Sequence, residues 1–88
     1  SGFIVVGNEP ALREAGARPA ARVVGWATVG VAPDNMGHGP VPAIERLLRR
    51  HGLRVEDVDY WEINEAFAAV TLHVERQLGV PRARTNLY

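Results

Sequence analysis

Cysteine and lysine are absent from this 88-residue sequence, and serine occurs once, at Ser1. The lack of cysteine excludes a disulfide, a thiolate metal cluster and a cysteine nucleophile within these residues. The lack of any internal serine likewise excludes a serine nucleophile. Histidines are present at His38, His51 and His73, but none is four residues from another. We therefore expect no zinc or other metal site.

An excess of charge and a long apolar run are also lacking. Ten arginines balance ten acidic residues and are scattered along the chain, so nucleic acid and anionic membranes are not expected partners. The longest mostly apolar stretch, residues 23–32, is far below the ~18 residues of a membrane span. No basic segment precedes an apolar signal core. We therefore expect a soluble protein of the cytoplasm.

The composition and length fit a small globular unit. Apolar residues make up 47% of the chain and charged residues 23%, close to the averages for globular domains. A chain of this size buries only about 60–65% of the surface that its unfolded form exposes. The sequence begins at Ser1 and stops at Tyr88 within a predicted strand, so we expect both ends to be cut from a longer chain. Apolar surface should then be left bare where missing strands would pack.

Strand and helix patterns alternate along the chain. The predicted strands cover residues 3–6, 22–31 and 60–63 and begin again at Asn86. The predicted helices run from a cap at Asn8 to Gly16, from Pro42 to Gly52 and from Asn64 to Gly79. Residues 22–31 are apolar on both alternating faces, which is typical of a strand covered by helices on two sides. The pattern predicts an α/β fold with layered helices around a mixed sheet.

Two turns carry the chemically suggestive residues: the glycine loop, residues 36–40, and the asparagine corner, residues 62–67. Ligands gather at such strand-to-helix corners in α/β sheets. The glycine loop lacks the third glycine of a dinucleotide fingerprint and the ending of a P-loop, which disfavours a nucleotide site. In the corner, Asn64 is explained by helix capping, and Glu65 by the helix dipole as readily as by acid–base catalysis.

Three arginines follow the glycine loop on one predicted helix. Arg46, Arg49 and Arg50 fall largely on its outer face. Two of them lie in the last turn, where cations complement the helix dipole. Solvation is the favoured interpretation, and phosphate binding is the alternative.

The two turns form motifs that occur together in one family. They read Met36-Gly37-His38-Gly39-Pro40-Val41-Pro42-Ala43 and Glu62-Ile63-Asn64-Glu65-Ala66-Phe67-Ala68-Ala69, with Asp57-Val58-Asp59 between them. In this order they resemble the thiolases, the acyl-CoA C-acyltransferases. The resemblance implies a thiolase-like fold in which residues 1–20, a strand and a helix, end the N-terminal domain and residues 21–88 start the C-terminal domain.

The resemblance also implies a reaction on coenzyme A thioesters. A cysteine thiolate takes an acyl group from acyl-CoA and an enolate of acetyl-CoA attacks it, or CoA is the nucleophile in the reverse direction. Thiolases place that cysteine upstream, and a Gly-His-Pro histidine and a second cysteine downstream. His38 does not replace that histidine, because it occupies the variable position of the glycine loop. The chain alone is therefore predicted to be inactive, and its parent to be a homo-oligomeric enzyme of lipid metabolism with no cofactor beyond the CoA substrate.

Four residues match family positions with a role. By the resemblance, Asn64 is the catalytic asparagine that holds a water in the oxyanion hole. Met36, Ala66 and Phe67 match positions that line the acyl pocket. From the residues alone Met36 and Phe67 would be core residues, and the resemblance favours the pocket. Two other classes stay open: a non-catalytic thiolase-like module for lipid transfer or protein interaction, and a dehydrogenase-type nucleotide domain that binds NAD.

Overall fold

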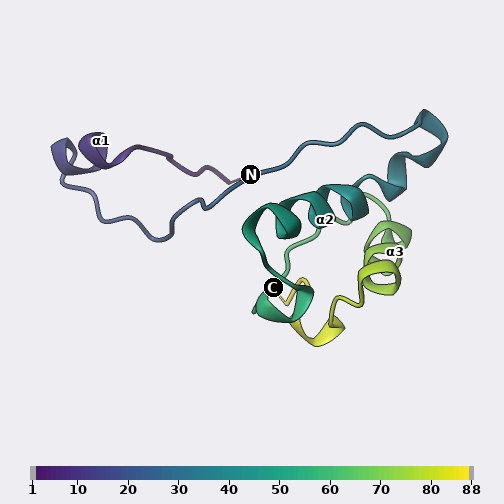
Figure 1. Cartoon of the computed structure of the whole chain (residues 1–88). Coiled ribbons are helices and arrows are strands. Elements are labelled where there is room, and N and C mark those ends of the chain that lie inside the picture. Colours follow the sequence, from purple (N-terminus) through teal and green to yellow (C-terminus); the bar gives the residue numbers. More distant parts are fainter. Residues whose placement is uncertain (1, 88) are drawn as a thin grey trace.

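A computed structural model describes residues 2–87 of the chain (Figure 1). It contains the α-helices α1 (Glu9–Glu14), α2 (Pro40–His51) and α3 (Ala68–Leu78) and the 3-10 helices η1 (Pro33–His38), η2 (Val55–Asp57) and η3 (Arg82–Arg84). Helices α2 and α3 pack with the C-terminal segment, whereas the N-terminal segment with α1 extends away from them. The described residues therefore divide into a packed half and an open half.

The helix ends follow the capping residues that the sequence predicts. The Oδ1 atom of Asn8 accepts a hydrogen bond from the Ala11 N–H at 3.0 Å and caps α1. Gly16, Gly52 and Gly79 end the three α-helices with φ values of 59°, 63° and 68°. Glycine adopts this left-handed conformation without the steric cost of a Cβ. The three predicted helices are confirmed, although α2 begins two residues early, at Pro40.

The start of α3 differs from the prediction. The helix begins at Ala68 with Phe67 as its N-cap residue, and no side chain caps it. Asn64 lies four residues before the helix, so its interpretation as a helix cap is wrong. Glu65 is also outside the first helical turn, so the helix dipole does not explain it. The asparagine corner is instead an irregular segment between the core and α3.

The predicted strands are not formed by residues 2–87. The one β pairing among them is an isolated parallel bridge between Trp61 and Thr85. Two hydrogen bonds make it, from the Trp61 N–H to the Arg84 carbonyl at 2.8 Å and from the Asn86 N–H to the Trp61 carbonyl at 2.9 Å. Residues 22–31, the open segment, make no backbone–backbone hydrogen bond. A strand needs a neighbouring strand that pairs with its N–H and C=O groups. The predicted strands find no such neighbour within residues 2–87, so the strand predictions are wrong for this part of the chain.

The core lies between α2, α3 and the Trp61 bridge. Val74 of α3 is fully buried, and Trp61, Ile63 and Val80 are nearly so. Residues of α2 and of the following turn pack around this cluster: Val41, Ile44, Leu48, Val55 and Val58. Trp61 and Ile63 both point inward. They are the two residues of the Tyr60–Ile63 stretch that an alternating pattern places on one face.

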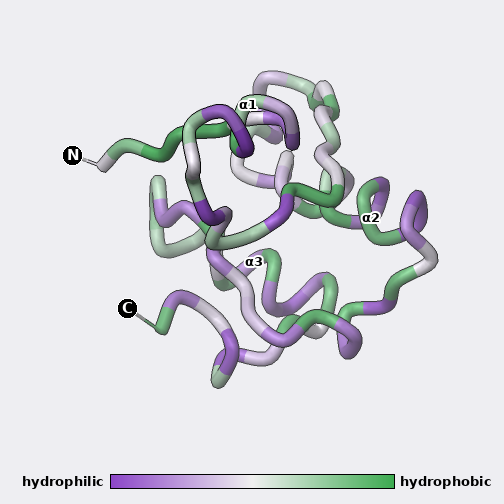
Figure 2. The backbone as a smooth tube through the Cα atoms, turned by 90° about the vertical axis from the view of Figure 1, so that its left-hand side faces the viewer, coloured by the Kyte–Doolittle hydropathy of each residue, from purple (hydrophilic) through white to green (hydrophobic). Residues whose placement is uncertain are grey.

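Bare apolar surface is present in the open half, as expected. Phe3 and Val5 are 97% and 99% exposed, and Trp26 is 75% exposed. Figure 2 shows the N-terminal run as a hydrophobic stretch close to the N-terminus. No helix that the structure describes combines the length and the apolar character needed to cross a bilayer.

A short turn joins α2 to the core strand-like segment. In η2 the Asp57 carboxylate accepts hydrogen bonds from the backbone N–H of Arg54 at 2.8 Å and from its guanidinium at 3.2 Å. These bonds lower the pKa of Asp57, chiefly through the side-chain hydrogen bond. The turn is therefore fixed by a local capping pair and leads directly to Tyr60 and Trp61.

Candidate functional site

The asparagine corner is held in place by Asn86, a residue outside both sequence motifs. The Asn86 Oδ1 atom accepts a hydrogen bond from the Ile63 N–H at 2.7 Å, and its Nδ2 donates to the Ile63 carbonyl at 2.8 Å. The same Nδ2 donates to the Glu65 Oε1 atom at 2.9 Å. One amide side chain thus pairs with both backbone groups of Ile63, as a neighbouring strand would.

The backbone of Asn86 explains how it reaches that position. Asn86 has a φ of 47° and is the one non-glycine residue with a positive φ among residues 2–87. Asparagine tolerates this left-handed conformation better than most residues. Its own N–H donates to the Trp61 carbonyl at 2.9 Å, so the residue both completes the bridge and turns its amide onto Ile63. The site therefore depends on contacts between segments more than twenty residues apart.

Asn64, by contrast, carries a free amide. Its side chain is exposed and makes no hydrogen bond within the part of the chain that the structure describes. It lies between Ile63 and Glu65, whose backbone and carboxylate are both fixed by Asn86. A rigidly held corner with an unoccupied amide can donate to and accept from a bound molecule or water without losing an internal bond.

The other three predicted site residues are also exposed. Met36 of η1 is 73% exposed and Phe67 is 69% exposed, so core packing does not explain either of them in these residues. Phe67 lines an open pocket of about 580 Å³ between η1 and α3, together with His38 and His73. Met36, Ala66 and Asn64 do not line this pocket. The structure thus brings one of the four predicted residues to a cavity and leaves three on the surface around it.

The two histidines of this pocket are in direct contact. The rings of His38 and His73 stack with centroids 4.1 Å apart and planes 24° from parallel. No group of three His, Cys, Asp or Glu side chains within residues 2–87 could hold a metal ion. The pocket therefore has a stacked imidazole pair in its wall, without the further ligands that a metal would need.

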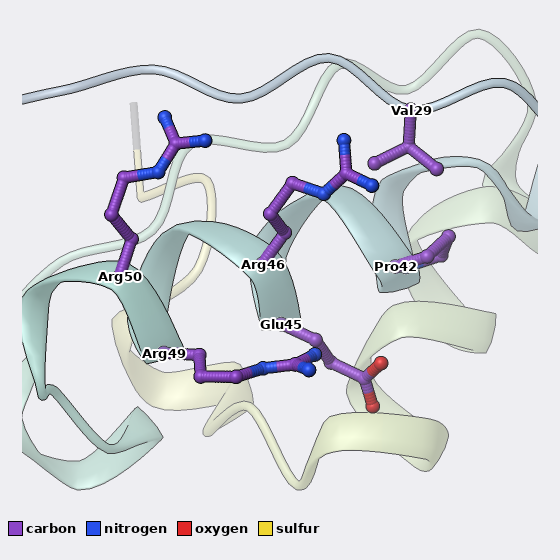
Figure 3. A pocket seen from close by; sticks show the side chains of 6 residues that line it. All are labelled: Val29, Pro42, Glu45, Arg46, Arg49 and Arg50. Carbon is purple, nitrogen blue, oxygen red and sulfur yellow. The ribbon is translucent and has the colours of Figure 1, made fainter.

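A second pocket lies along the outer face of α2 (Figure 3). It has a volume of about 400 Å³ and is lined by Val29, Pro42, Glu45, Arg46, Arg49 and Arg50. Arg46 donates to the Thr28 carbonyl at 2.9 Å, and Arg50 donates to the Trp26 carbonyl at 3.2 Å. Figure 3 shows both guanidinium groups turned toward the open segment, whereas Arg49 extends in another direction.

This arrangement corrects the interpretation of the arginines. Arg46 and Arg50 are exposed, but they bind backbone carbonyls instead of serving only as a solvated face. Trp26 and Thr28 are two residues apart, so their carbonyls leave one edge of an extended chain. The three cations do not converge on one point, and this pocket therefore does not have the geometry of a phosphate site.

Comparison with known proteins identifies the family. A sequence model described as the C-terminal domain of thiolase matches residues 17–88. The chain belongs to the thiolase family. The 3-oxoadipyl-CoA/3-oxo-5,6-dehydrosuberyl-CoA thiolase of Escherichia coli K12 is 49% identical over 78 residues, which cover 89% of this chain and 20% of that enzyme. The human mitochondrial 3-ketoacyl-CoA thiolase is 41% identical over 87 residues, or 99% of this chain and 22% of that enzyme.

Solved thiolase structures share the fold of this chain. Human mitochondrial 3-ketoacyl-CoA thiolase in complex with CoA matches 89% of the chain with a TM-score of 0.80 and 45% identity. The peroxisomal 3-ketoacyl-CoA thiolase of Saccharomyces cerevisiae, described as a five-layered structure built from two core domains of identical topology, matches 86% with a TM-score of 0.80 and 39% identity. These matches support a thiolase-like fold, although residues 2–87 do not form its mixed sheet, and the chain spans about a fifth of the length of these thiolases. The division of this chain at residues 20 and 21 stays a prediction.

The contribution of Asn86 can be tested by substitution. Asn86→Ala removes the three side-chain hydrogen bonds of the asparagine corner and leaves the N–H and C=O of Ile63 without a partner. At about 0.5–1.5 kcal/mol for each bond, we expect the free energy of unfolding to fall by about 2–4 kcal/mol. Asn64→Ala, at an exposed asparagine of the same corner that makes no hydrogen bond among residues 2–87, is the matched control and should change the free energy of unfolding by less than about 0.5 kcal/mol. Amide hydrogen exchange at Ile63 measures the local effect, and unchanged protection in Asn86→Ala would contradict the assignment.

Proposed function

We propose that this chain supplies the oxyanion asparagine and part of the acyl pocket of a thiolase, an acyl-CoA C-acyltransferase. The observation that carries the proposal is the free amide of Asn64 on a corner fixed by Asn86. Related proteins are named as 3-ketoacyl-CoA thiolases, and two related structures were solved with CoA. These names support a coenzyme A thioester as the substrate and a 3-ketoacyl-CoA as the molecule that is cleaved or formed.

The chemistry divides between this chain and residues outside it. In the cleavage direction, a cysteine thiolate attacks the 3-keto carbon and the bond between C2 and C3 breaks. Its electron pair forms the enolate of acetyl-CoA, which then takes up a proton. The acyl group leaves the cysteine when the thiolate of CoA attacks it. This chain contains no cysteine, so the cysteine thiolate and the proton donor would belong to other parts of a longer protein, and the second thiolate is that of the substrate CoA.

The part proposed for Asn64 is to stabilise the enolate oxygen. Its amide would hold a water that donates to this oxygen as negative charge develops there. An uncharged donor on a fixed corner needs no reorganisation during the reaction, which is the condition for strong electrostatic stabilisation. Met36, Ala66 and Phe67 would keep bulk water from the thioester. Phe67 has the clearest position for this, since it lines the pocket beside η1.

The wider expectations are part of the same proposal. A longer protein that carries this chain would be a homo-oligomer in the cytoplasm and would need no cofactor besides its CoA substrate. Relatives have names from more than one compartment, such as the cytosolic acetyl-CoA acetyltransferase of mouse and the mitochondrial thiolase of human. The compartment therefore remains a prediction from the sequence. A non-catalytic thiolase-like module for lipid transfer or protein interaction is the alternative.

A graft separates the enzyme from the alternative. In it, the segment of the E. coli thiolase that aligns with this chain is replaced by the chain itself, so that the relative supplies the remaining four-fifths of the protein. A functional site predicts CoA-dependent cleavage of a 3-ketoacyl-CoA by the graft. A non-catalytic module predicts a folded graft that binds acyl-CoA without cleaving it.

A further inference from the structure

The glycine loop and α3 are joined by the stacked rings of His38 and His73. His38 is the last residue of η1 and lies two residues after Met36. His73 is half-buried on α3, six residues after Phe67. The imidazole pair therefore connects the two segments that carry the apolar residues of the proposed acyl pocket.

The backbone of the loop supports the same contact. A Cβ atom added at Gly37 would lie 3.8 Å from the Cγ2 atom of Val70, an ordinary van der Waals distance. Val70 is one turn before His73 on α3, so Gly37 and His38 contact the same face of this helix. The loop thus lies against α3 through the imidazole stack, with Gly37 and Val70 lining the same pocket of about 580 Å³ beside it.

The imidazole stack has no ion-pair partner among residues 2–87. Imidazole is the side chain that gains its charge between pH 5 and 8. Neither ring is within ion-pair distance of a carboxylate among residues 2–87. The other charged residues that line the pocket are Asp34 from η1 and Arg76 from α3, and no charged residue of α2 does so. The charges of Asp34 and Arg76 offset each other. A second proton on the imidazole pair would therefore have no counter-charge in the pocket lining.

We propose that the His38–His73 stack is a pH-operated clasp that positions the glycine loop and thereby the acyl pocket. With at most one ring protonated, the rings stack and hold the glycine loop against α3, beside the pocket that Phe67 lines. When both rings are protonated, two positive charges about 4 Å apart repel and the loop leaves α3. The effect of the clasp on the acyl pocket rests on the proposed function, whereas the clasp itself depends only on the two rings.

Nuclear Overhauser effects between the two rings test the clasp in the 88-residue chain. We expect ring-to-ring cross-peaks at pH 7.5 and weaker ones at pH 5.0, because repulsion between unit charges at this distance in water lowers the equilibrium constant for stacking about fivefold. His73→Phe keeps an aromatic ring and removes one charge, so its cross-peaks to His38 should persist at pH 5.0. His51→Gln, a histidine outside the pocket, is the control and should behave as the unchanged chain. Cross-peaks that are absent at pH 7.5, or that keep their full intensity at pH 5.0 in the unchanged chain, would overturn the clasp.

The graft tests the link to the pocket. We expect the ratio of kcat/KM at pH 7.5 to that at pH 5.5 to be several-fold larger with the unchanged chain than with His73→Phe. Equal ratios together with a pH-dependent stack would show that the clasp does not reach the acyl pocket. A graft that is inactive at both pH values would instead contradict the proposed function, and the ring-to-ring cross-peaks alone would then decide whether the clasp exists.

Discussion

Asn64→Ala is expected to lower the kcat of the grafted thiolase by about 10²–10³-fold, with little change in KM for the acyl-CoA. The structure gives the reason, since the Asn64 amide is exposed and makes no hydrogen bond within the described residues. Its removal therefore breaks no internal hydrogen bond among residues 2–87. The water that it would hold acts on charge that develops only in the transition state, so the loss should appear in turnover and not in binding.

Steady-state kinetics with a 3-ketoacyl-CoA and CoA measure this effect. Asn35→Ala is the matched control, because Asn35 is an exposed asparagine of η1 to which no role is assigned. Its kcat should stay within about twofold of the unchanged graft, as is usual for the substitution of an exposed side chain without a hydrogen bond. If Asn64→Ala turned over as fast as Asn35→Ala, Asn64 would not belong to the oxyanion hole.

Trp61→Ala is expected to lower the free energy of unfolding by about 3–5 kcal/mol, the usual effect of removing a large buried aromatic side chain. Trp61 is 8% exposed and packs with Ile63, Val74 and Val80. It also forms the bridge to Thr85 that leads to Asn86. A loss of this size is a large part of the stability of a chain of this length, at roughly 0.05–0.15 kcal/mol per residue.

Trp61→Phe is the control for this substitution. The Nε1 atom of Trp61 is buried without a hydrogen-bond partner among residues 2–87. Phenylalanine keeps most of the packing and removes this unsatisfied donor, so the two effects offset and the change should stay within about 1.5 kcal/mol. Urea unfolding followed by far-UV circular dichroism gives both values. A loss for Trp61→Ala that is as small as the one expected for Trp61→Phe would show that Trp61 does not anchor the core.

The local parts of the fold were predictable from the sequence, because their causes are local. Asn8 caps α1 through an N–H three residues away, and Gly16, Gly52 and Gly79 end helices through their own backbone conformation. Strands depend on partners from elsewhere in the chain. Residues 22–31 have a strand pattern, but within the described residues their carbonyls meet only the side chains of Arg46 and Arg50.

The same distinction applies to the site. The motif singled out Asn64 because its neighbours in the sequence carry the resemblance. It did not single out Asn86, whose hydrogen bonds to Ile63 span 23 residues and need a positive φ. The contact between His38 and His73 was likewise hidden, since it joins two segments through the packing of η1 on α3. The sequence signal available for Asn86 was its residue type, because asparagine adopts the left-handed conformation more readily than most residues.

The turnover of the graft between this chain and the E. coli thiolase tests the proposed function most directly. The chain covers 20% of that enzyme and is 49% identical to the segment it would replace. If the chain carries a working oxyanion corner, the graft should cleave a 3-ketoacyl-CoA with a kcat within about tenfold of the unmodified relative, a change of about 1.4 kcal/mol in the barrier. A folded graft that binds the acyl-CoA but shows no CoA-dependent cleavage would contradict it.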